Sequence, residues 1–364
     1  MFRWIIKFSI IFLFFTSTAQ PNIAHCQDST VRIKAKGRSY IGKELVYTGK
    51  EMALMRRDGR ISILPVNSRR EVKTISRSFK PYRADIIRDQ LQKEFGNDYH
   101  VSTTSNFVVV HPPGEYQKWA TPFEVLYQRF RNYFSSRGFN VDKPEFPLIV
   151  VVLNRRSEFD KFQKTYHSPG ANILGYYSQK SNRIITYDPT GGRSTGSDWA
   201  YNDTLIHEAV HQTAYNTGIH RRYGYSPTWI VEGLACMFEA EGVYDIVNHP
   251  GIKERINQDR LAALKYYYKK GRVKGKLLQF VASDDLFQAD AGLSYAYAWG
   301  LTFFLAEKYP AKYFRYLQAD GKRSEFQDYT AKERTKAFTD AFGVNTDDLE
   351  VRMENFIKTL KMKR

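Results

Sequence analysis

The chain has 364 residues, of which 42% are hydrophobic and 26% charged, and 55 Lys and Arg against 38 Asp and Glu give a formal charge of +17. This length allows one large domain and a small one, and the two cysteines exclude a disulfide framework. The basic charge suits anionic partners such as acidic polysaccharide, phospholipid or nucleic acid, unless it is simply a solvated basic face.

The first residues are typical of a secretory signal peptide. Basic residues and an apolar run to Phe15 are followed by small residues, and we expect residues 1–19 to be removed. The run is too short to span a bilayer, so we expect no transmembrane segment after cleavage. Lipidation at Cys26 and an uncleaved anchor are the alternatives, but His25 stands where a lipoprotein signal needs a small residue. Export predicts a secreted, periplasmic or cell-surface protein, for which nucleic acid is the least expected partner.

Residues 31–75 are predicted to form a small all-β domain of SH3-like size. Glycines separate its short apolar runs, as in strands joined by tight turns, and the runs are 31–34, 44–48, 52–55 and 61–64. Residues 31–83 hold 15 Lys and Arg against 4 Asp and Glu, so most of the net charge lies here. We expect this domain to attach the protein to an anionic surface, with a solvated basic face as the alternative. Residues 76–98 are predicted to be a linker with a helix at 84–95.

Residues 99–364 are predicted to form the larger domain, in which a mixed sheet is followed by a mainly helical C-terminal half. The strands are expected at 101–104, 107–110, 148–153, 173–178 and 183–187, and the helices at 115–137, 158–166, 253–269, 295–308 and 347–360. One of the last two strands is expected to line a substrate cleft, and the glycine-rich stretch 190–197 is expected to be a loop near it. The fold class is therefore α+β.

The clearest chemistry lies in the run 207–211, which reads His-Glu-Ala-Val-His. Imidazoles four residues apart lie on one face of a helix, so His207 and His211 can bind the same metal ion. Glu208 can hold and deprotonate a metal-bound water. Apolar neighbours favour a buried metal site over a surface helix with two solvated histidines, and Gly218 is the expected end of this helix.

A third metal ligand is expected on a second helix. Ser226 is its predicted N-cap and Pro227 its first residue. Glu232 lies in the apolar run 229–235, where a carboxylate is costly to bury unless it is paired or bound to a metal. Two histidines, one glutamate and an open fourth position form the arrangement of a catalytic zinc ion. The alternative is a surface glutamate on an amphipathic helix.

These residues resemble the gluzincin metallopeptidases, in which such a helix is followed by the pattern Trp-x-x-Glu-Gly that begins here at Trp229. The chain is also similar to an uncharacterised bacterial family called domain of unknown function 1570, related to the peptidase MA-like group. The resemblance covers most of residues 100–320, although only 206–235 carries specific motifs. It implies a zincin-like fold and one Zn²⁺ ion, with Glu208 as the general base. The ligands that it implies are His207, His211 and Glu232.

The resemblance further implies that the helix at 293–305 follows the site and supplies a hydrogen-bond donor to the oxyanion. Tyr295 is our first candidate for this donor and Tyr297 the second, and core aromatic residues are the alternative. His220, between the two ligand helices, is a weaker candidate. Glu239 is expected either to accept a hydrogen bond from a ligand imidazole or to be solvated.

We therefore predict a secreted zinc metallopeptidase, in which Glu208 takes up a proton as metal-activated water attacks a peptide carbonyl. One alternative is a binding protein on a catalytically retired zincin fold at an anionic cell surface, which the intact Glu208 argues against. The other is a zinc amidase that acts on cell-wall material. Cys236, four residues after Glu232, is expected to be a small buried residue and not a ligand.

Overall fold

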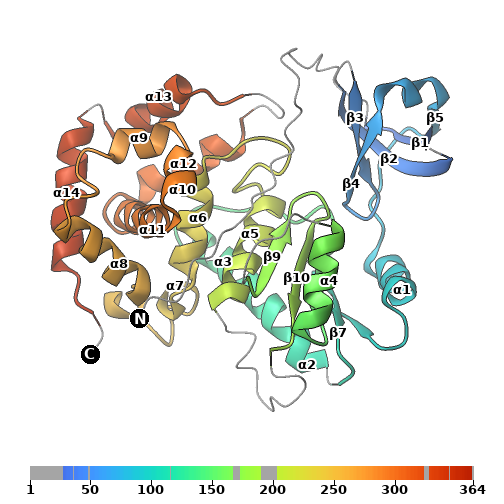
Figure 1. Ribbon diagram of the computed structural model, residues 1–364, viewed down its shortest axis with the longest axis horizontal. Helices are drawn as coiled ribbons and strands as arrows, with labels where there is room; N and C mark the ends of the chain where they lie inside the picture. Colours follow the sequence, from blue (N-terminus) through green and yellow to red (C-terminus); the bar gives the residue numbers. More distant parts are fainter. Residues whose placement is uncertain are drawn as a thin grey trace.

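The computed structural model describes residues 28–35, 37–47, 50–114, 116–166, 173–189, 203–323, 328–343 and 345–362. The predicted signal peptide, Cys26 and the glycine-rich stretch 190–197 lie outside the described residues. Within them the chain forms an N-terminal antiparallel sheet, a second sheet and a helical C-terminal half (Figure 1). The α+β prediction is therefore confirmed. No helix in the described ranges has the length and apolar character needed to cross a bilayer.

The N-terminal sheet has the strand order β4-β3-β2-β1-β5 and is antiparallel throughout. Its elements are β1 (Thr30–Ala35), β2 (Arg38–Tyr47), β3 (Glu51–Arg56), β4 (Ile61–Pro65), the 3-10 helix η1 (Val66–Glu71) and β5 (Lys73–Ser76). β2 pairs with β1 through its first half and with β3 through its second half, and a bulge between Glu44 and Val46 lets it bend between them. Alternate residues of β1 are buried, which is the period of two that predicts a strand.

The second sheet is mixed and has the order β6-β7-β8-β10-β9. Its strands are β6 (His100–Thr103), β7 (Phe107–His111), β8 (Leu148–Leu153), β9 (Gly175–Ser178) and β10 (Arg183–Tyr187). β7, β8 and β10 are parallel to one another, which explains why β8 is apolar and buried at every position. β6 and β9 are the antiparallel edge strands.

Helices cover both faces of this second sheet. One face carries α1 (Ala84–Phe95) and α4 (Arg156–Tyr166), and the other carries α2 (Tyr116–Trp119), α3 (Thr121–Ser135) and α5 (Asp203–Asn216). The helix expected at 115–137 is thus two helices. The chain breaks near Ala120, and Pro122, which has no N–H to donate, stands at the start of α3. α1 occupies the predicted linker and packs Ile87 and Leu91 against the sheet.

The C-terminal half is helical, as predicted. It contains α6 (Thr228–Phe238), α7 (Glu241–Tyr244), η3 (Ile252–Glu254), α8 (Gln258–Lys269), α9 (Leu277–Ala282), α10 (Asp285–Ala289), α11 (Ala291–Lys308), α12 (Pro310–Gly321), α13 (Ala331–Phe342) and α14 (Thr346–Thr359). α11 is its central helix and is buried from Leu293 to Ala306. α6 crosses α11 so closely that a Cβ atom on Gly233 would lie 2.1 Å from Thr302 Oγ1 and 2.6 Å from the Ala298 carbonyl oxygen. Only glycine fits there, and this crossing sets the position of Glu232.

Candidate metal centre

Helix α5 lies between the second sheet and α6, and its residues from Thr204 to Tyr215 are all buried. Gly218 follows its C-terminus with φ +77°, and the amides of Ile219 and His220 both donate to the Ala214 carbonyl. Gly218 ends the helix as predicted, because a residue with a side chain rarely adopts this conformation. The helix therefore presents its two histidines to α6 from inside the protein.

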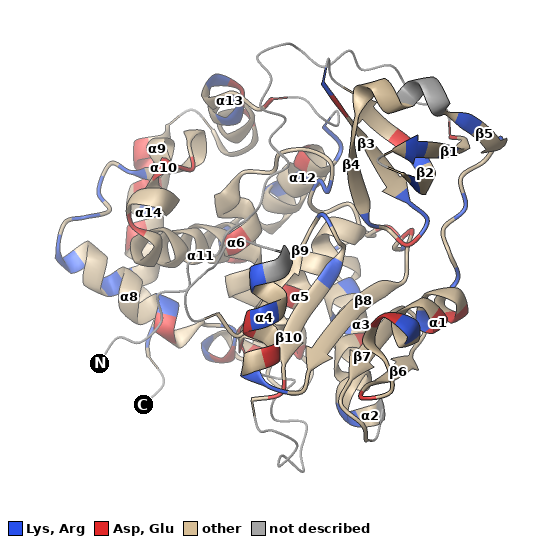
Figure 2. Cartoon of the chain, turned by 45° about the vertical axis from the view of Figure 1, so that its right-hand side comes forward, with Lys and Arg blue, Asp and Glu red and all other residues tan. Residues whose placement is uncertain are grey.

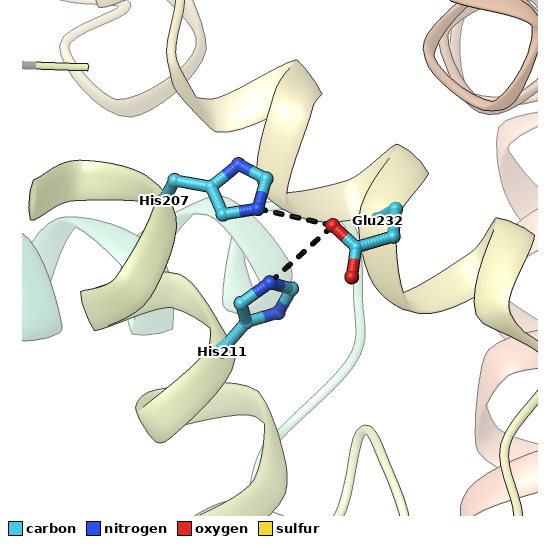
Figure 3. A group of neighbouring side chains, drawn as sticks. All are labelled: His207, His211 and Glu232. Atoms are coloured by element: carbon cyan, nitrogen blue, oxygen red, sulfur yellow. Dashed lines mark hydrogen bonds and ion pairs between the residues drawn. The ribbon is translucent and has the colours of Figure 1, made fainter. Parts of the chain in front are cut away.

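Side chains from both helices meet at one point, as Figure 3 shows. Glu232 Oε2 lies 3.1 Å from His207 Nε2 and 3.5 Å from His211 Nε2. Ligand atoms that surround a zinc ion tetrahedrally at about 2.0–2.1 Å are separated from one another by about 3.3 Å. The two distances bracket this value, so the group can hold one metal ion.

The residues of this group and the neighbouring Glu208 are buried, so solvent does not stabilise their charges. Glu232 is 0% exposed, Glu208 1% and His207 2%, so none of their charges is solvated. Within the described chain, Glu208 Oε1 and Glu232 Oε1 have no hydrogen-bond partner. Buried oxygens without a partner are rare in native proteins, and a cation with its bound water would satisfy them. The residues present therefore fit a metal ion.

Burial and neighbouring charges move the pKa values of the candidate ligands in different directions. Burial acts to raise the pKa of Glu232, but the nearby His211 and His207 outweigh it and hold that pKa well below its usual value. Burial also acts to lower the pKa of His207, yet contacts with Cys236, Glu232 and Glu239 raise it. Burial lowers the pKa of His211. A metal ion must therefore displace a proton from His207 but none from Glu232.

Glu208 lies next to the ligands and touches the sheet. Its Oε2 accepts a hydrogen bond from the Tyr177 backbone amide at 2.6 Å. Burial raises the pKa of Glu208 to about 8, although His207 and the Tyr177 amide act against this shift. A carboxyl group with a pKa near neutrality suits a general base, which must both accept and return a proton.

Glu239 contacts the first histidine, which is one of the two roles that the sequence left open for it. His207 Nδ1 lies 2.7 Å from Glu239 Oε1, and the Asn257 amide donates to Glu239 Oε2 at 2.5 Å. Arg260 Nη2 lies 3.9 Å from Glu239 Oε1. This chain of contacts fixes the imidazole so that Nε2 faces Glu232, a common arrangement around metal-binding histidines.

Cys236 lies close enough to His207 and Glu239 to form a second possible ligand group. The thiol is fully buried, and burial raises its pKa. Because the thiolate is the metal-binding form, this thiol is a poorer ligand than the carboxylate of Glu232. Glu239 and His207 Nδ1 already bind each other. The group with Glu232 is therefore the better metal site.

The structure separates the three candidate oxyanion donors. Tyr295 is buried with its ring 6.5 Å from that of His207, between their centroids. Tyr297 instead donates its hydroxyl to Glu350 at 3.0 Å, inside the helical core, so this candidate is wrong. Residues two apart on a helix point to nearly opposite sides, and only one of the two tyrosines can face α5.

His220 is buried against Tyr215, with 5.3 Å between the ring centroids. Burial lowers its pKa to about 3, so its imidazole is neutral at pH 7, and His211 adds to this shift. In the part of the chain that the structure describes, neither ring nitrogen has a hydrogen-bond partner. His220 stays the weaker candidate for the oxyanion donor, after Tyr295.

The N-terminus of α6 differs from the prediction. Pro227, predicted as the first helical residue, is the N-cap, and the helix begins at Thr228. The hydroxyl of Ser226, the predicted N-cap, donates to Asp320 Oδ2 at 2.7 Å. A carboxylate distant in sequence takes that role, since Asp284 Oδ1 accepts the Thr228 amide at 3.2 Å. Sequence analysis also missed the Tyr177 amide and Asn257, because a backbone amide and a loop asparagine carry no local signal of a site.

Fold and site together define an α+β protein with a buried group of two histidines and a glutamate that can hold a metal ion. A family model described as a protein of unknown function, DUF1570, matches residues 202–327. This range contains the three candidate ligands, Glu208 and Tyr295, and the match supports the predicted relationship to that family. No curated protein matches the chain.

Proposed function

We propose that the protein is a zinc-dependent peptidase of the gluzincin type. The observation that carries the proposal is the convergence of His207, His211 and Glu232 on one point, with Glu208 beside them. Two imidazoles and one carboxylate suit zinc, and three protein ligands leave a position for water or substrate.

The fold supports the proposal. α5 packs against β9 and β10, and β9 is an antiparallel edge strand beside the candidate base. An extended peptide can bind along such an edge, which is the cleft-lining role expected for one of these two strands. We extend the proposal to a zincin-like domain and an SH3-like N-terminal domain. The bent β2, shared between two parts of one sheet, supports the latter.

The protein has a candidate general base, a backbone amide that holds this base and a candidate hydrogen-bond donor to the oxyanion. Zinc bound here would supply Lewis acidity and an acidified water. Glu208 accepts a proton at Oε1 while the Tyr177 amide holds Oε2, and it then passes that proton to the leaving amine. Tyr295, beside His207, is the proposed donor to the oxyanion.

The test combines metal analysis of the full-length protein with cleavage of casein and a peptide library. We expect about one zinc per chain. We also expect Glu208→Gln to keep the zinc but to lose at least about a hundredfold in cleavage rate. His249→Ala is the matched control, because His249 lies outside the ligand group and pairs with Glu241. Absence of zinc would overturn the metal site. Zinc without cleavage that depends on Glu208 would favour the retired enzyme or a cell-wall amidase.

The second candidate function is binding to an anionic surface through the basic N-terminal sheet (Figure 2). Arg32 on β1 and Lys73 on β5 stand opposite each other, both exposed, and no salt bridge joins either to a described carboxylate. Like charges facing each other across a strand pair destabilise the sheet, and an anionic partner would relieve this cost. We propose export of the protein together with this anionic partner.

Cosedimentation with vesicles tests this binding. We expect binding to vesicles that contain anionic phospholipid and not to neutral ones, with an affinity that falls as salt rises. Arg32→Glu with Lys73→Glu should abolish binding. Lys312→Glu with Arg315→Glu makes the same charge change at exposed positions of α12 and should not. Equal binding by both double variants would exclude the sheet as the binding face.

A further inference from the structure

The N-terminal sheet packs directly on the larger part of the protein. Its residues Val46, Met55 and Ile61 share an apolar cluster with Phe146, which lies two residues before the start of β8. Tyr223, from the loop between the two ligand helices, packs against the same cluster. This sheet therefore has a buried apolar contact with the segment that leads into the second sheet.

Two turns meet beside this cluster. The Ile61 amide donates to the Lys180 carbonyl at 2.8 Å, which joins the β3–β4 turn to the β9–β10 turn through the backbone. Gly59 has φ +83°, and a Cβ atom there would lie 3.1 Å from the Phe146 ring and 3.4 Å from the Asn182 side-chain amide. The two turns are in close contact, and only glycine is unstrained at this position.

Arg222, in the loop between α5 and α6, forms hydrogen bonds to both turns. Its guanidinium is buried, and Nε and Nη2 donate to the Gln179 carbonyl at 3.1 and 2.9 Å. Nη2 also donates to the Gly59 carbonyl at 2.5 Å. Burying a guanidinium costs free energy unless its N–H groups donate hydrogen bonds. The contact between the two sheets therefore includes specific hydrogen bonds in addition to the apolar cluster.

The β9–β10 turn is linked in turn to the candidate base. Asn182 Oδ1 accepts the Tyr177 hydroxyl at 2.8 Å, and the Asn182 carbonyl accepts the Gln212 side chain at 3.0 Å. Gln212 lies on α5, four residues after Glu208, and the Tyr177 amide holds Glu208 Oε2. Hydrogen bonds, connected by the short stretch of chain from Tyr177 to Asn182, thus link the N-terminal sheet through the turn to Glu208.

We propose that the N-terminal sheet is a positioning element of the candidate site. Gly59 and Arg222 hold the β9–β10 turn, and the turn holds β9 at the distance where the Tyr177 amide fixes Glu208. None of these groups touches the three metal ligands, so Arg222 acts as a positioning residue and not as a catalytic one. An effect of this positioning on catalysis rests on the proposed function, but the link through hydrogen bonds from the N-terminal sheet to Glu208 does not.

Hydrogen exchange measured by mass spectrometry on the full-length, zinc-treated protein tests the link. We expect Arg222→Ala to increase amide exchange at least about tenfold across residues 175–187, with protection of the buried helix α11 unchanged. Arg222→Lys, which cannot reach both carbonyls in the same way, should give a smaller increase. Gly59→Ala should produce the same local increase in exchange, because it displaces the β3–β4 turn while residue 222 is still arginine. Arg255→Ala is the matched control, because Arg255 bonds to Glu307 and the Pro250 carbonyl in the helical half.

Activity provides a separate readout. If the protein cleaves a peptide, Arg222→Ala should lower kcat at least about tenfold with unchanged zinc content, and Arg222→Lys should restore part of it. If it cleaves none, the proposed function fails, while the exchange result still decides the link. Unchanged exchange across residues 175–187, or an equal increase over the whole chain, would overturn the proposal. If Arg222→Ala does not fold, Arg222→Lys and Gly59→Ala decide it by the same criterion.

Discussion

Glu208 combines two properties that a general base needs. Its Oε2 is fixed by the Tyr177 amide, whereas Oε1 has no partner in the described chain and is available to a proton. Burial, against the effects of His207 and the Tyr177 amide, raises the pKa of this group to about 8 and keeps it protonated at neutral pH in the metal-free protein. A metal ion beside it would favour the carboxylate, so metal binding and readiness of the base are coupled.

The raised pKa of Glu208 predicts a pH-dependent stability of the metal-free protein. The carboxyl has its usual pKa of 4.5 in the unfolded chain and a pKa of about 8 in the folded protein, so only the folded state keeps the proton between these pH values, and stability falls as pH rises through that window. Glu208→Gln removes the cost. We expect the variant to gain on the order of a few kcal/mol over wild type at pH 8.5 and little at pH 4.5, measured by thermal unfolding after chelator treatment. The same difference at both pH values would contradict this cause.

We expect Glu239 to affect metal affinity, although it is not one of the three candidate ligands His207, His211 and Glu232. Glu239→Gln weakens the acceptor that orients His207 through Nδ1, and we expect zinc affinity to fall about 10–100-fold. Competition with a chromophoric chelator measures this change. Glu241→Gln, in the next helix and paired with His249, is the control and should leave the affinity unchanged. Equal affinities of both variants and wild type would show that Glu239 has no orienting role.

At the scale of elements, the site depends on how closely α6 and α11 cross. Gly233, next to Glu232, allows that approach because Thr302 Oγ1 and the Ala298 carbonyl occupy the space of a side chain. Tertiary contacts also altered the ends of helices. Asp284 replaces the local cap of α6, and the break at Ala120 divides a helix that the periodicity predicts as one.

The crossing gives a stability prediction. Gly233→Ala forces the two helices apart, and we expect a loss of about 1–3 kcal/mol or more in the free energy of unfolding. Thr302→Ala removes one of the two obstructing groups, so the double variant should recover part of this loss. Urea unfolding of the single and double variants measures the coupling. Strictly additive effects would show that Thr302 is not the obstruction.

At the scale of the whole molecule, the candidate ligands come from two helices joined by a loop, so a metal ion bound there would link α5 to α6. Zinc at about 100 times its Kd should stabilise the folded protein by about 2.7 kcal/mol, and chelation should reverse the effect. Thermal unfolding with zinc and with EDTA measures both. His211→Ala should abolish the zinc-dependent shift, and His249→Ala should keep it. A zinc effect that survives in His211→Ala would place the ion elsewhere.

The sequence by itself determined what depends on neighbouring residues. The spacing of His207 and His211 places both imidazoles on one helical face, the apolar run around Glu232 predicts its burial, and period-two patterns locate most strands. Such signals are local because helix and strand geometry repeat over a few residues.

Only the tertiary structure decided which groups surround those residues. The Tyr177 amide reaches Glu208 across 31 positions of the chain, and Arg222 reaches Gly59 across 163. The tertiary structure also places Tyr295 beside His207 and Tyr297 against Glu350, although both tyrosines belong to the same apolar helix. A hydrogen bond between distant segments depends on how the elements pack, and that packing leaves no periodic trace in the sequence.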